Sequence, residues 1–200
     1  MTLLYSALLG YLIGSLPTAS AIARLRHIDL RSSGSGNPGT NNARKLGGLR
    51  LATPILIVEF AKGVTCVALG GLIAGDAGSV VAGVSGIAGN VFNVWYRFAG
   101  GKGLAITGGV LLALWPAGFV VVVATIAVGA MVAKSTGMAS LIAIFVMIAI
   151  ALAWAARQWP NGWGIENVSL LPYFAVAVGV IVAPKHLLDA RDRLREPSRP

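Results

Sequence analysis

Long runs of apolar residues dominate this chain, and polar residues gather in the short stretches between them. All the runs but one are near the roughly 20 residues with which a helix crosses a bilayer, and the exception, 104–133, is too long for one span. Trp115-Pro116-Ala117-Gly118 is a turn signal inside that run, so we divide it into helices over 104–115 and 117–133, the first short or partly re-entrant. The pattern predicts an all-α integral membrane protein with about seven transmembrane helices. The runs cover 2–23, 51–74, 79–95, 104–133, 137–156 and 167–183.

Composition supports a membrane location. Hydrophobic residues make up 56% of the 200 residues, charged residues only 12%, and the mean hydropathy is +0.78, which excludes an ordinary soluble domain. The single Cys66 lies in an apolar run, so we expect no disulfide framework and no cysteine-based metal site. The segment 1–23 has no basic start and is followed by further spans, so we expect a retained helix rather than a cleaved signal peptide.

The distribution of basic residues predicts the orientation. If the loop 24–50 lies in the cytoplasm, alternation of the spans places all of the 16 basic residues there except Lys62 and Arg157. We therefore expect the N-terminus outside and the C-terminus in the cytoplasm, and the net charge of +9 indicates topology rather than a nucleic-acid partner. Three polar patches then share the cytoplasmic face: 34–48, 97–103 and the segment that begins at Lys185.

The first patch has the composition of a phosphate-binding loop. Its glycines allow positive φ and close backbone approach, so that successive N–H groups can surround an anion, while its serine, asparagines and cations add donors and charge. The alternative is a flexible loop whose cations only follow the positive-inside rule. The residues concerned are Gly34, Ser35, Gly36, Asn37, Gly39, Asn41, Asn42, Arg44 and Lys45.

The second patch, Gly100-Gly101-Lys102-Gly103, leads directly into an apolar helix. Free amides at the helix N-terminus and the Lys102 ammonium can together hold an anion. The segment is not a Walker A loop, because Tyr96 stands where that motif needs its first glycine and Gly103 where it needs Ser or Thr. The alternative is a basic turn at the membrane edge.

Two further groups of polar residues are candidates for the same site. Glu59 and Lys62 share a helix face at a depth that is awkward for ions, so they form either a structural ion pair or a polar wall of the site. His186 follows the last span, and one helical face can present it together with Asp189, although a solvated tail is the ordinary alternative. The histidines alone do not make a metal site.

Several motifs resemble one known family, the acyl-phosphate:glycerol-3-phosphate acyltransferases. They are Gly14-Ser15-Leu16-Pro17, Gly-Ser-Gly-Asn-Pro-Gly at 34–39 followed by Asn42, Lys45 and Gly47, Glu59-Phe60-Ala61-Lys62-Gly63, the Gly-Gly-Lys-Gly motif within 98–105, and Met138-Ala139-Ser140. Their order and spacing fit the family across about 14–189. The resemblance implies a seven-helix fold in a bacterial inner membrane with its active site on the cytoplasmic face. We therefore expect one membrane acyltransferase domain over 1–189 and a basic cytoplasmic tail over 190–200.

The resemblance also implies a reaction, in which a fatty acyl group passes from acyl phosphate to the sn-1 hydroxyl of glycerol 3-phosphate. The products are lysophosphatidic acid and phosphate, and no metal, cofactor, acyl-CoA, acyl carrier protein or obligate protein partner is implied. Either His186 or a substrate phosphate oxygen would deprotonate the acceptor, with Ser35 as nucleophile the weaker possibility. The implied catalytic residues are Ser35, Lys102 and His186, and the implied phosphate-binding residues are Gly34, Gly36, Asn37, Gly39, Asn42, Lys45, Gly100, Gly101, Gly103, Lys185 and Asp189.

The chain departs from the family pattern in several places. Thr40-Asn41 replaces Ala-Thr, and Lys45 replaces an arginine, which removes a bidentate phosphate contact that Arg44 can restore. Asn90 stands where the family has histidine, and Lys185-His186-Leu187-Leu188-Asp189 matches Arg-His-x-x-Asn only loosely. These changes leave open a different acceptor or a catalytically inactive homologue.

Alternatives from other classes are a transporter or binding protein for an anionic lipid or phosphometabolite, and a structural membrane subunit. The depth of Glu59 and Lys62 favours a transporter, whereas the absence of inverted repeats argues against it. A structural subunit would not explain why glycine, asparagine and lysine recur in three cytoplasmic patches.

Overall fold

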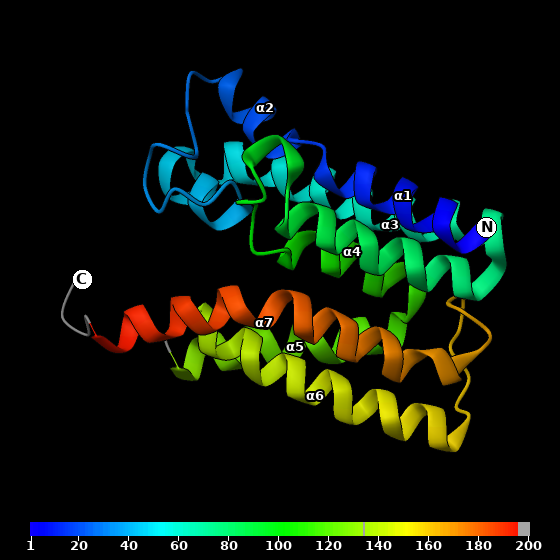
Figure 1. Cartoon of the computed structure of the whole chain (residues 1–200). Helices are drawn as coiled ribbons and strands as arrows, with labels where there is room; N and C mark the ends of the chain where they lie inside the picture. The colour runs from blue at the N-terminus through cyan, green and yellow to red at the C-terminus, as the bar shows by residue number, and fades with distance from the viewer. Residues whose placement is uncertain (134, 196–200) are drawn as a thin grey trace. The chain divides into compact units, whose positions relative to one another are not determined.

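The computed structural model describes residues 1–133 and 135–195, and within them all regular structure is helical (Figure 1). Lys134 and the end of the predicted tail, which includes Arg199, lie outside these residues. The chain divides into two compact units, Met1–Leu114 and the part from Trp115 onward. The elements are α1 (Thr2–Ser15), α2 (Thr18–Arg24), α3 (Thr40–Val91), η1 (Val94–Tyr96), α4 (Leu104–Leu114), α5 (Pro116–Ala133), α6 (Thr136–Arg157), η2 (Val168–Leu170) and α7 (Leu171–Arg195).

The first predicted span is interrupted near its end. Pro17 lacks the N–H group that a continuous helix needs, and the chain leaves helical geometry at Leu16 before α2 begins at Thr18. Carbonyl groups at this break accept hydrogen bonds from side chains far along the sequence. Asn93 Nδ2 donates to Ser15 O at 2.7 Å, and Lys62 Nζ donates to Leu16 O at 2.9 Å. The break therefore places polar side chains beside the backbone of the first helix.

The 52 residues of α3 do not form one rod. Ala74 and Gly75 are non-helical, with Gly75 at φ +59°, and the chain reverses there into two antiparallel arms. Ser79 Oγ donates to Val67 O at 3.1 Å across the turn, and Asn90 Nδ2 reaches Glu59 Oε2 at 2.8 Å near the open end. The first arm contains the predicted helix over 51–74, and the second corresponds to the one predicted over 79–95, although it ends at Val91. The prediction of a loop over 34–48 is wrong in its second half, because α3 begins at Thr40 and is interrupted at Gly48, with φ +64°.

Small residues set the close spacing of the first unit, in which α1, α3 and α4 lie side by side (Figure 1). A Cβ atom at Gly14 would overlap the carbonyl of Gly86, and one at Gly109 of α4 would overlap the carbonyl of Phe60. Backbones approach this closely in membrane proteins because no hydrophobic force from water holds the helices together and direct packing must do so. Glycines such as Gly14 and Gly109 thus lie at helix crossings.

In the second unit α6 packs against both α5 and α7. Trp154 of α6 lies edge-on to Trp115 and to Trp159, with ring centroids 5.8 Å and 5.1 Å apart. The Arg157 guanidinium lies 5.6 Å from the centroid of the Trp159 ring. Aromatic and cationic side chains of this kind are typical of a membrane interface, and here they lie at the end of α6 that the sequence places outside.

The all-α membrane fold is confirmed, whereas the number of spans and their orientation stay predictions. Among the residues that the structure describes, four segments are long and apolar enough to cross a membrane, and one of them, Thr40–Tyr96, contains both arms of α3. The 11 residues of α4 extend only about 16 Å, which fits the predicted short or re-entrant segment. Helix α7 continues to Arg195, past the predicted domain boundary at 189, so the single domain and its tail also remain predictions.

Candidate functional site

The loop before α3 has the backbone geometry that its glycines allow. Gly34 and Gly36 have φ of +62° and +69°, a region that L side chains rarely adopt. Ser35 lies between them and is exposed, and its N–H group donates to Asn42 Oδ1 at 3.0 Å. The same asparagine donates from Nδ2 to Leu30 O at 2.9 Å and to Ser33 O at 3.0 Å. Asn42 is only 1% exposed, so it holds the loop in shape from within instead of presenting a donor to a ligand.

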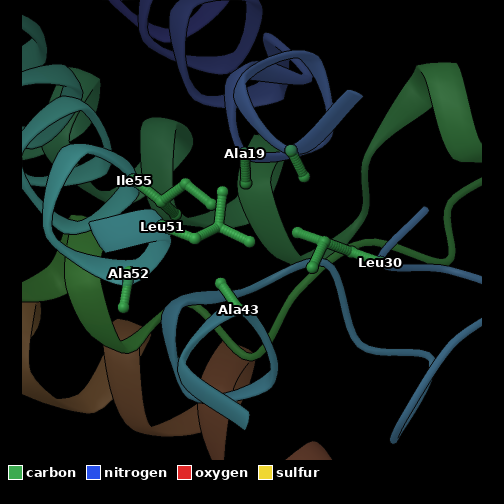
Figure 2. Packing of buried hydrophobic residues seen from close by; sticks show 7 residues of the cluster. Ala19, Leu30, Ala43, Leu51, Ala52 and Ile55 are labelled. Carbon is green, nitrogen blue, oxygen red and sulfur yellow. The ribbon is translucent and has the colours of Figure 1, made fainter. Parts of the chain in front are cut away.

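An apolar cluster fixes this loop to the helices beneath it (Figure 2). Leu30 of the loop is fully buried between Ala19 of α2 and side chains of α3. Burying a leucine contributes about 1.5–3 kcal/mol, which offsets part of the entropy lost when the loop is ordered. The α3 members of the cluster are Ala43, Leu51, Ala52 and Ile55.

The loop ends where α3 begins, with Gly39 as N-cap. The N–H of Gly39 donates to Asn37 O at 2.9 Å, and the first turn of the helix starts at Thr40. The opening N–H groups of a helix have no carbonyl partner within it, and they carry partial positive charge. Lys45 is exposed one turn further on, so the loop can offer an anion both amides and an ammonium group.

Two charged residues, Asp29 and Arg31, stabilise the start of the loop, just after α2. Asp29 Oδ1 accepts the backbone N–H of Arg31 at 2.9 Å, and this hydrogen bond is the main reason that the pKa of the Asp29 carboxyl is lowered. The Arg31 guanidinium crosses to the second patch: it donates to Ala99 O at 3.0 Å and lies 4.3 Å from the centroid of the Tyr96 ring. Arg31 thus connects the start of the loop between α2 and α3, whose glycine-containing part, 34–39, we call the Gly-rich loop, to the segment that contains Lys102.

The turn at 97–103 uses its glycines differently from the prediction. The N–H groups of Gly100 and Gly101 donate to Val91 O and Asn90 O, at 3.1 Å and 3.0 Å, and so complete the last turn of α3. In this conformation those two amides serve the fold, not an anion. Gly103, at φ +81°, redirects the chain into α4, and the patch keeps two cations, the half-buried Lys102 and the exposed Arg97.

Beneath both patches lies a buried polar cluster centred on Glu59. Lys62 Nζ is 3.0 Å from Glu59 Oε2, and each of the two residues is 6% exposed, so the predicted ion pair is present. Thr18 Oγ1 donates to Glu59 Oε1, and Asn90 Nδ2 donates to Oε2 at 2.8 Å. Four donated hydrogen bonds, two of them from Lys62, therefore compensate the carboxylate for its burial.

Three residues of this cluster, Thr18, Glu59 and Asn90, line a small cleft. The cleft lies between the α1–α2 break, Pro38 of the Gly-rich loop and Gly101 of the Gly100–Gly103 turn, so these segments meet in the first unit. Ser35, Lys45 and Lys102 are not among its lining residues, and their shared site stays a prediction. Sequence reasoning did not anticipate Thr18, Asn93 or Tyr96 as lining residues, because each makes its contacts across many residues of chain. The lining residues are Leu16, Pro17, Thr18, Ala19, Pro38, Glu59, Asn90, Asn93, Tyr96 and Gly101.

The remaining predicted site residues belong to the second unit. His186 is 1% exposed, while Lys185 and Asp189 are half-buried on the same helix, α7. A Cβ atom at Gly137 would lie 3.0 Å from His186 O and 3.1 Å from Asp189 Oδ2, so α6 begins close beside this stretch of α7. Whether these residues share one site with Ser35 and Lys102 stays a prediction.

Comparison with known proteins identifies the family. The family model described as glycerol-3-phosphate acyltransferase matches residues 4–195. The chain belongs to this family. A glycerol-3-phosphate acyltransferase of Bradyrhizobium diazoefficiens is 37% identical over 69% of this chain and 70% of its own length. One from a Synechococcus species is 35% identical over 93% of this chain and 87% of its own.

Solved structures show the same fold. The crystal structure of PlsY (YgiH), an integral membrane glycerol 3-phosphate acyltransferase, matches in its lysophosphatidic acid form with a TM-score of 0.78 and 22% identity, over 100% of this chain and 95% of that one. Its glycerol 3-phosphate form matches with a TM-score of 0.76 over 98% and 92%. The helical arrangement of this family is therefore present in the chain.

Proposed function

We propose that this protein transfers a fatty acyl group from acyl phosphate to the sn-1 hydroxyl of glycerol 3-phosphate, giving lysophosphatidic acid and inorganic phosphate. The observation that carries the proposal is the meeting of the Gly-rich loop and the Gly100–Gly103 turn at one cleft, in a chain of the glycerol-3-phosphate acyltransferase family. A cation accompanies each segment, Lys45 just after the first and Lys102 in the second, and both substrates carry phosphate. The site would face the cytoplasm from a bacterial inner membrane.

The reaction needs charge stabilisation more than covalent catalysis. The acceptor hydroxyl attacks the acyl carbon, a new ester C–O bond forms, and the bond between that carbon and the phosphate oxygen breaks. Negative charge grows on the carbonyl oxygen and then on the leaving phosphate, where preorganised donors lower the barrier. We assign these roles to Lys102, to Ser35 and to the opening amides of α3, with Lys45 or the neighbouring Arg44 holding a substrate phosphate.

The hydroxyl proton needs an acceptor. His186 can take it if the second unit brings its imidazole to the site, and otherwise a phosphate oxygen of the substrate takes it directly. In either case the proton leaves with inorganic phosphate, so the protein is unchanged after each turnover. Because acyl phosphate is already activated, Ser35 need not form an acyl-enzyme.

The experiment supplies palmitoyl phosphate and labelled glycerol 3-phosphate to the purified protein in detergent, and it measures both labelled lysophosphatidic acid and orthophosphate. We expect acceptor-dependent phosphate release in equal amount to the lipid formed. The double variant Ser35→Ala, Lys102→Ala should lose on the order of 100-fold or more in kcat/KM.

The matched control is Arg26→Ala, which removes an exposed cation from the same loop outside the cleft and should leave activity within about twofold of wild type. Wild-type activity no higher than that of the double variant would overturn the proposal. Uptake of labelled substrate into proteoliposomes without chemical conversion would favour a transporter instead.

A further inference from the structure

The side chain of Asn90 joins two parts of the first unit that are separate in sequence. Its Nδ2 donates to Glu59 Oε2 at 2.8 Å, on the first arm of α3, and it lies at the end of the second arm. Its backbone carbonyl accepts the N–H of Gly101 at 3.0 Å, which belongs to the turn that carries Lys102. One residue therefore contacts both the buried ion pair and the cationic turn.

The turn packs against Asn90 without spare room. A Cβ atom at Gly101 would lie 3.2 Å from Asn90 Oδ1, and one at Gly100 would overlap Asn90 O. The Asn90 side chain and carbonyl thus lie beside the backbone that precedes Lys102, and only glycine fits at position 100. Glu59 in turn is held by Lys62 and Thr18, so the support of Asn90 is itself rigid.

We infer that Asn90 is a positioning residue: it links the Glu59–Lys62 pair to the Gly100–Gly103 turn and thereby sets the position of Lys102, which follows Gly101 of the cleft lining. This inference rests on the proposed function, since it assigns Lys102 to the phosphate of the substrate. Asn90 touches no reacting atom in this account and acts through Lys102.

The choice of an amide also has a consequence for charge. Asn90 meets the Glu59 carboxylate with a neutral amide donor, so it adds no charge of its own to the buried ion pair. The charged or titratable groups of the cleft and its ion pair are Glu59 and Lys62 on α3 and Tyr96, while Lys102 follows Gly101 on the turn. The α1–α2 break contributes Thr18 but no titratable side chain to the cleft lining.

The first test is a double-mutant cycle on kcat/KM. We expect Asn90→Ala to lose on the order of 10-fold to 100-fold in the wild-type background, because displacing a positioned cation by about 1 Å has such effects. In a Lys102→Ala background the same change should have little further effect, because Lys102 is the group through which Asn90 acts. Additive losses would overturn the inference.

A pH profile distinguishes positioning from general damage. In Asn90→Asp the new carboxyl lies beside Glu59, and only its protonated form can donate the hydrogen bond that the amide donates. The activity of this variant relative to wild type should therefore recover as the pH falls, whereas that of Asn90→Ala should stay low throughout. A flat ratio for both variants would contradict the inference.

The control is Ser79→Ala, which removes a buried hydrogen bond to Val67 O near the closed end of the same hairpin. It costs stability without touching the turn, so its effect on kcat/KM should be within about twofold and additive with Lys102→Ala.

A labelling experiment keeps the inference testable if the proposed function fails. In a Cys66→Ala background, Lys102→Cys carries the only thiol, and its rate of reaction with a water-soluble maleimide reports its position. Asn90→Ala should change this rate several-fold and Ser79→Ala should not. An unchanged rate overturns the inference, whereas an inactive wild type with a changed rate overturns only the acyl-phosphate reaction.

Discussion

At the scale of single residues, buried polar side chains here hold backbone in place for the exposed ones. Asn42 satisfies one N–H and two carbonyl groups of the loop, and Asn90 satisfies Glu59. Leaving a buried polar group without its partner lowers the free energy of unfolding by more than an average hydrogen bond contributes to it. Replacing either asparagine should therefore destabilise the fold more than the loss of one hydrogen bond would.

Asn42 is the clearest residue-level prediction. We expect Asn42→Ala to lower the free energy of unfolding by about 1–3 kcal/mol, because it leaves Leu30 O, Ser33 O and the Ser35 N–H without their partner. Thermal unfolding of the purified protein in detergent measures this. The matched control is Asn41→Ala at the exposed neighbouring position, expected within about 0.5 kcal/mol of wild type. Equal effects of the two changes would contradict the account.

At the scale of elements, the first unit depends on helices whose backbones touch. The contacts of Gly10 with Ala82 and of Gly14 with Gly86 repeat every four residues on both helices and in the same direction, so α1 runs parallel to the second arm of α3. Because these contacts are between backbone atoms, no side chain can change its rotamer to make room for a larger residue, and the helices themselves would have to move apart.

Gly14→Leu should therefore separate α1 from α3 and destabilise the unit by roughly 1–3 kcal/mol or more. The measurement is the fraction of monodisperse protein and its thermal midpoint in detergent. Leu12→Phe enlarges a side chain that is 58% exposed on the same helix and should be tolerated. If both variants behaved like wild type, the close approach of these helices would be disproved.

Much of the element-level structure was predictable, because apolar length and turn residues are local signals. The break at Trp115-Pro116, the reversal near 75 and the Glu59–Lys62 pair follow from local patterns, although α5 begins at Pro116, one residue before the predicted 117. The contact of Asn90 with Glu59 depends on the register of the α3 hairpin, which no local pattern specifies. A glycine pair after a helix is equally suited to an anion and to a helix end, and here Gly100 and Gly101 complete α3.

At the scale of the whole molecule, the distribution of charge predicts the orientation in the membrane. In a Cys66→Ala background we expect Glu166→Cys to react with a membrane-impermeant maleimide in intact spheroplasts, and Ser32→Cys to react only after permeabilisation. Both positions are exposed, so a difference reports the side of the membrane and not burial. The reverse labelling pattern would overturn the predicted orientation and with it the cytoplasmic site.

The break between α1 and α2 also bears on how the protein is made. The Ser15 carbonyl receives its hydrogen bond from Asn93, 78 residues later, and the Leu16 carbonyl receives one from Lys62, 46 residues later. The Leu16 carbonyl also accepts the nearby Thr18 N–H at 2.9 Å. Until Asn93 has been synthesised, however, the Ser15 carbonyl must keep water or lipid headgroups as partners, since a bare carbonyl is costly in hydrocarbon. The first helix to enter the membrane is thus completed only when the second arm of the hairpin arrives.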